Sequence, residues 1–156
     1  MNEAVRIPPN SEEAELCVLG SILIDNDAML TVSEFLRSEN FYNANHGSIY
    51  EAMMKLYENR FPIDIVTVSE KLKELKLLKR VGGKAFLTKL ANEVPTAANV
   101  ESYGRIIKAL SAKRELISAA GKIGEMAFDD GMAADELLDA AEQAVFSLSQ
   151  KHLKSV

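Results

Sequence analysis

Residues 97–128 read AANVESYGRIIKALSAKRELISAAGKIGEMAF, a stretch without proline and without a strong helix break. Its stripe of regularly spaced positions advances by alternating steps of three and four residues, a spacing typical of an amphipathic α-helix. These positions are Val100, Tyr103, Ile107, Leu110, Arg114, Ile117, Gly121, Gly124 and Phe128. The stretch therefore predicts one helix about 45 Å long, at a rise of about 1.5 Å per residue.

A second amphipathic helix follows this one after a short turn. The turn is Asp-Asp-Gly at residues 129–131. Beyond it, the apolar positions advance by steps of four, three and four residues and are Leu137, Ala141, Ala144 and Leu148, flanked by Leu138 and Val145. Two amphipathic helices joined by a tight turn predict an antiparallel helical hairpin.

The sequence before the hairpin contains several shorter helical patterns. Ser11 precedes a turn rich in glutamate, and Asp64 precedes a cluster of β-branched residues that could also form a strand. Both residues are favoured helix caps, and the polar sequence after Asp64 supports a helix there. We therefore predict an all-α fold: a compact multi-helix head, residues 1–95, and then a long antiparallel hairpin and the start of a linker, residues 96–156.

Composition excludes several classes of protein. The 156 residues are 47% apolar and carry a net charge of −5, with a single cysteine. This composition is not that of a disordered chain or a secreted disulfide scaffold. No apolar run approaches about 18 residues, so we expect no membrane span and a cytoplasmic location. The acidic balance indicates little or no direct DNA binding.

No catalytic, cofactor or metal site is predicted. Gly82-Gly83-Lys84 is the nearest match to a phosphate-binding loop, but its spacing is wrong and no strand precedes it. His46, His152 and Cys17 lack the spacing of a metal site. We expect His46 to pack or cap a helix, His152 to lie in a frayed tail, and the glutamates of first turns to be exposed.

The hairpin carries more apolar surface than two helices can bury against each other. Gly121 and Gly124 would let another backbone approach closely. This surface must meet either residues 1–95 or a second copy of the chain, and we favour a second copy. The predicted self-association residues are Tyr103, Ile106, Ile107, Leu110, Ile117, Ala120, Gly121, Ile123, Gly124, Leu137, Leu138, Ala141, Val145 and Leu148. On this basis, Ile107→Asp or Ile117→Asp should weaken self-association and leave the head folded.

Five spaced blocks of the sequence share a further feature, and they are RIPPNSEEAELCVLGSIL (6–23), FYNANHGSIYEAM (41–53), PIDIVTVSEKL (62–72), GGKAFL (82–87) and VPTAANVESY (94–103). In this order, the blocks resemble the N-terminal domain of bacterial DnaB-type replicative helicases. Members of that family continue into a motor domain with a Walker A loop, which this sequence lacks. The chain is therefore expected to be a non-catalytic fragment or domain, and ATP and magnesium would bind only in the motor.

The resemblance implies a scaffolding role. Hairpins of this family pair into dimers, and three dimers form a collar on the motor ring that docks the C-terminal domain of primase and contacts helicase loader proteins. The expected partner surfaces are the basic turn with Lys79, Arg80 and Lys84 and the exposed face of the hairpin. The alternatives are a helical DNA-binding regulator, which would use the basic stretch 71–80, and a monomeric adaptor.

Overall fold

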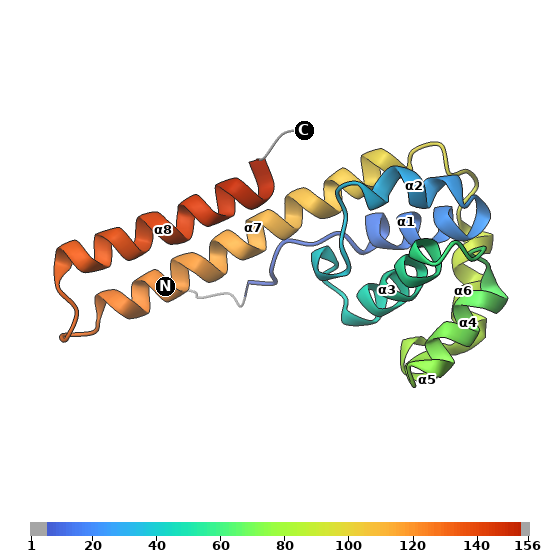
Figure 1. Cartoon of the computed structure of the whole chain (residues 1–156), viewed down its shortest axis with the longest axis horizontal. Helices are drawn as coiled ribbons and strands as arrows, with labels where there is room; N and C mark the ends of the chain where they lie inside the picture. Colours follow the sequence, from blue (N-terminus) through green and yellow to red (C-terminus); the bar gives the residue numbers. More distant parts are fainter. Residues whose placement is uncertain (1–5, 154–156) are drawn as a thin grey trace. The chain divides into compact units, whose positions relative to one another are not determined.

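The computed structural model describes residues 6–153, and every regular element in that range is a helix (Figure 1). The elements are α1 (Glu12–Ile24), α2 (Asp27–Ser33), a 3-10 turn η1 (Ser38–Asn40), α3 (Ala44–Glu58), α4 (Ile65–Glu74), α5 (Leu78–Val81), α6 (Gly83–Glu93), α7 (Val100–Ala127) and α8 (Ala134–Leu153). The all-α class predicted from the sequence is confirmed.

The chain forms two compact units. Asn10–Lys108 make one, the core unit, and the described residues 6–9 with 109–153 make the other, the hairpin unit. The division between them falls inside α7, so the first turns of this helix belong with the core unit. The boundary expected at residues 95/96 falls upstream, in the loop between α6 and α7.

Side-chain caps begin the helices of the core unit where the sequence predicts them. The Ser11 hydroxyl accepts a hydrogen bond of 3.1 Å from the backbone N–H of Ala14. Asp64 accepts one of 2.8 Å from the N–H of Thr67, whose hydroxyl accepts from the N–H of Asp64 in return. Each cap accepts from a backbone N–H group at the start of its helix, which has no hydrogen-bond partner within that helix. This reciprocal box explains why the β-branched cluster after Asp64 forms α4 and not a strand.

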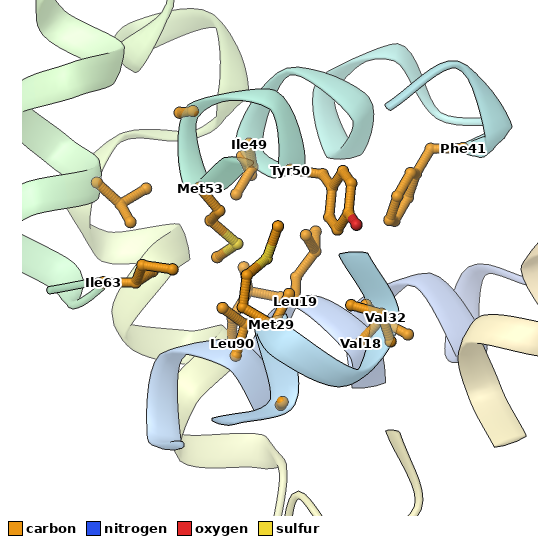
Figure 2. Close-up of a cluster of buried hydrophobic side chains, with 14 of the residues drawn as sticks. Val18, Leu19, Met29, Val32, Phe41, Ile49, Tyr50, Met53, Ile63 and Leu90 are labelled. Atoms are coloured by element: carbon orange, nitrogen blue, oxygen red, sulfur yellow. The ribbon is translucent and has the colours of Figure 1, made fainter. Parts of the chain in front are cut away.

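The core of this unit lies among α1, α2, α3, α4 and α6 (Figure 2). Its largest fully buried side chains include Leu19, Met29, Ile49 and Tyr50. The hydroxyl of Tyr50 donates to the carbonyl oxygen of Leu36 over 2.9 Å, so this buried polar atom is satisfied. Apolar packing therefore dominates this core, and the hydroxyl of Tyr50 is buried in it at no cost in unpaired polar groups.

Two glycines permit close helix packing in the core unit. A Cβ atom on Gly20 of α1 would lie 2.6 Å from the carbonyl oxygen of Leu90 in α6. One on Gly104 of α7 would lie 2.9 Å from the ring of Phe35. Neither position has room for a methyl group. These contacts bring α6 against α1 and the start of α7 against the end of α2.

The first turns of α7 complete this core and correct one prediction. Ile107 is only 2% exposed and belongs to the buried apolar cluster, and Tyr103 packs against that cluster. Ile107 therefore cannot supply a surface between copies. Ile117, on the same predicted stripe, is 58% exposed. The core unit ends at Lys108, so the part of the stripe that follows lies beyond this core.

Candidate self-association and docking surfaces

The hairpin unit has the predicted antiparallel geometry (Figure 1). Its turn is held by the carboxylate of Asp129, which accepts from the N–H of Gly131 over 2.9 Å. At the other end, Lys151 donates to Glu115 over 2.7 Å and the ring of His152 hydrogen-bonds the same carboxylate. The expectation of a frayed tail at His152 is therefore wrong. The partner that orders it lies 37 residues earlier in the chain.

The carboxylate of Glu115 makes this end of the hairpin sensitive to acid. Burial raises the pKa of Glu115, but the hydrogen bonds and charges of Lys151 and His152 outweigh burial and place it below the ordinary 4.5. A lowered folded-state pKa adds stability above the unfolded pKa, and this stability is lost as pH falls through the folded value. Glu115→Gln should thus destabilise the chain by about 1 kcal/mol or less near neutral pH.

The difference in unfolding free energy between wild type and Glu115→Gln, followed by circular dichroism, should stay constant above about pH 4.5 and vanish in stronger acid. Glu125→Gln, an exposed change on the same helix, is the control. A difference that persists unchanged at the lowest pH would show that the ionised carboxylate does not hold the two helices together.

The two long sides of α8 have different surroundings. Leu137, Ala144 and Leu148 are half-buried on one side. On another side, Leu138, Val145 and Phe146 are 67%, 45% and 59% exposed. With Ala141, Glu142, Gln143 and Ser149, these three line an open concave surface of about 760 Å³. We call it the α8 outer face.

Exposed apolar side chains also lie along α7. Leu116 and Ile117 are 52% and 58% exposed, and Ile106, in the core unit, is 43% exposed. A Cβ atom added to Gly121 or Gly124 would meet nothing within 4 Å. The space beside these glycines is therefore open. Of the other predicted self-association residues, Ala120 is exposed, and Leu110, Ile123 and Ala141 are half-buried.

The predicted partner residues lie in the core unit, away from the hairpin turn in sequence. Lys79 and Arg80 lie in α5 and Lys84 in the first turn of α6, all three exposed. Gly82 between them has φ 114°, a left-handed conformation that glycine adopts without strain. Lys79 and Lys84 line one concave surface, and Arg80 is not part of its lining.

A buried pair of polar residues was missed by the sequence reasoning. The carboxylate of Glu15 lies 2.8 Å from Nδ1 of His46, and both side chains are 3% exposed. Glu15 also accepts from the backbone N–H groups of Tyr42, over 2.7 Å, and Asn43, over 3.3 Å. The expectation that Glu15 is exposed is wrong, and the packing role expected for His46 is confirmed. One feature of the sequence could have predicted that Glu15 is buried. The apolar residue Leu19 follows it by four positions and therefore lies on the same face of α1.

These polar groups offer no reactive centre. Glu15 and His46 use their hydrogen bonds to join α1 to the start of α3. Burial, followed by the charge of Glu13, raises the pKa of the Cys17 thiol, which keeps it protonated and weakly nucleophilic. Among residues 6–153, no three His, Cys, Asp or Glu side chains gather as metal ligands would. No helix in that range has the length and apolarity needed to cross a membrane.

The chain is similar to known proteins over most of its length. The family model described as the DnaB-like helicase N terminal domain matches residues 7–109. Replicative DNA helicase DnaB of Geobacillus stearothermophilus is 41% identical over 94% of this chain. Replicative DNA helicase DnaC of Bacillus subtilis is 39% identical over the same share. This chain spans 32% of the length of each relative.

Solved structures share the fold. The N-terminal domain of DnaB helicase from Mycobacterium tuberculosis superposes with a TM-score of 0.85 at 34% identity, covering 91% of this chain and 99% of that one. A DnaB-like replicative helicase, solved in a study of its interactions with primase, superposes with a TM-score of 0.74 at 24% identity, covering 90% of this chain and 31% of that one. The chain therefore belongs to the family of DnaB-like helicase N-terminal domains.

Proposed function

We propose that this chain forms the non-catalytic collar of a hexameric replicative DNA helicase. In this proposal, the hairpins pair two chains, three such dimers make the collar, and the collar docks the C-terminal domain of primase and a helicase loader in the cytoplasm. ATP and magnesium would be bound by a separate motor domain. The family membership and the replicative helicases among the relatives support this role.

The α8 outer face is the observation that carries the proposal. Burying a Leu, Val or Phe side chain contributes roughly 1.5–3 kcal/mol. Burying the exposed parts of Leu138, Val145 and Phe146 in two copies would contribute about 5–10 kcal/mol, which is of the same order as an association cost of about 4–15 kcal/mol. The exposed Leu116 and Ile117 of α7 add to the apolar surface of the hairpin unit.

The proposed primase partner rests on the relatives. The helicase solved in the study of its interactions with primase has the same fold as this chain. We assign partner contact to the exposed basic residues Lys79, Arg80 and Lys84, which lie in the core unit and leave the α8 outer face to the second copy. Self-association and partner docking then use separate surfaces.

Leu138→Asp tests the pairing surface. Placing a carboxylate in an apolar interface, twice in a symmetric dimer, should raise the dissociation constant at least about a hundredfold in sedimentation equilibrium. Ser147→Asp is the matched control, since Ser147 is exposed on α8, and nine residues turn a helix through about 180°. Equal association of both variants and wild type would contradict the proposed interface.

A further inference from the structure

A second concave surface, of about 580 Å³, lies on the core unit and is lined by residues of α4, α5 and α6 and of the turn before α5. We call it the basic hollow, and it is lined by Ser69, Lys73, Lys76, Leu78, Lys79 and Lys84, among others. Its four lysines face a single acidic residue, Glu70, in a chain whose net charge is −5. None of the four lysines forms an ion pair within residues 6–153. Their charges are available to a ligand.

The buried wall of the basic hollow contains a hydroxyl without a partner. Ser69 is 6% exposed, and its Oγ atom has no hydrogen-bond partner in the part of the chain that the structure describes. Buried polar groups are nearly always paired, so an unpaired hydroxyl at the wall of a hollow points to a missing ligand atom. Ser69 lines the hollow while its Oγ atom is buried, so a ligand reaches this hydroxyl once neighbouring side chains change rotamer.

The start of α6 adds backbone donors to the same place. Gly83 and Lys84 open this 11-residue helix and line the basic hollow. The N-cap is Gly82, which has no side chain to accept from the N–H groups of the first turn. A helix N-terminus with free N–H groups favours a bound anion. The lysines, the hydroxyl of Ser69 and these N–H groups therefore all select negative charge.

We propose that the basic hollow binds an acidic peptide segment of a partner protein. One carboxylate of the peptide accepts a hydrogen bond from the Ser69 hydroxyl, and the lysines pair with the other carboxylates of the peptide. An apolar side chain of the peptide lies against Leu78. No aromatic side chain lines the described hollow, whereas sites for single-stranded nucleic acid stack bases on such rings. The proposal deepens the partner-docking role of Lys79 and Lys84 and rests on it.

The test is fluorescence anisotropy of a labelled twelve-residue peptide of Glu and Asp with two Leu, added to the whole chain. A peptide with Lys in place of each acid and a twelve-nucleotide DNA strand are the comparison probes. Ser69→Ala should weaken binding about tenfold, as expected for a hydrogen bond to a charged group. The double variant Lys73→Gln with Lys84→Gln should weaken binding of the acidic peptide about fivefold. This difference from wild type should be smaller at high salt, which screens the charges.

Lys113→Gln with Lys122→Gln is the matched control, because it removes the same charge from exposed positions of α7 and should leave binding unchanged. No binding of the acidic peptide, equal loss in both lysine pairs, or no effect of Ser69→Ala would overturn the proposal. Tighter binding of DNA, lost in the same variants, would also overturn it. Sedimentation of each variant reports self-association separately, so failure of the basic hollow is distinguishable from failure of the collar.

Discussion

Glu15→Ala should lower the free energy of unfolding by about 3–5 kcal/mol, because it removes the acceptor of a buried hydrogen-bond network and leaves several donors unpaired. The change leaves the ring of His46 without its 2.8 Å contact. It also leaves the N–H groups of Tyr42 and Asn43 without the carboxylate that accepts from them. Because these groups precede and open α3, the loss loosens the contact between α1 and α3.

Urea unfolding followed by circular dichroism measures this effect. Glu13→Ala is the matched control: Glu13 is exposed in the same turn of α1, and its loss should cost less than about 1 kcal/mol. Equal destabilisation by the two variants would mean that the carboxylate of Glu15 contributes only through the helix dipole. The buried network would then have no role in joining the helices.

Ile107→Asp should destabilise the chain by more than about 4 kcal/mol, because it places an unpaired carboxylate in a site that is 2% exposed. Ile117→Asp, ten residues later on the same helix, changes a side chain that is 58% exposed and should cost less than about 1 kcal/mol. The two substitutions have identical chemistry, so their difference isolates the surroundings of each position.

The same pair of variants separates stability from assembly. Urea unfolding gives the stability of each variant, and sedimentation gives its mass. We expect Ile107→Asp to lose helical structure at low urea, and Ile117→Asp to stay folded. If Ile107→Asp unfolded at the same urea concentration as Ile117→Asp, the first turns of α7 would not be part of the core.

Local signals predicted the helices well. Ser11 and Asp64 cap the helices that follow them, and both interactions involve residues only three positions apart. The hairpin also follows from local features, since the turn at Asp129 and the two periodic stripes are contained in one stretch of sequence. The short helix α5 and the turn η1 went unpredicted, because elements of three or four residues show no periodicity.

Features that depend on contacts distant in sequence were missed. The spacing of the α7 stripe did not show that Ile107 faces the core while Ile117 faces solvent, since this depends on where the core unit ends along the helix. Glu15 and His46 are 31 residues apart, and only the packing of α1 on α3 brings them together. Likewise, the packing of α4 on α6 places Ser69 and Lys73 beside Lys84.

A sedimentation-equilibrium series of the wild-type chain over a wide range of concentration tests the central claim most directly. If the α8 outer face pairs two copies, the average mass should rise with concentration from that of one 17.2 kDa chain to at least twice that value. A mass of 17.2 kDa at every concentration would contradict the account, because the exposed apolar side chains of the hairpin would then have no second copy to cover them.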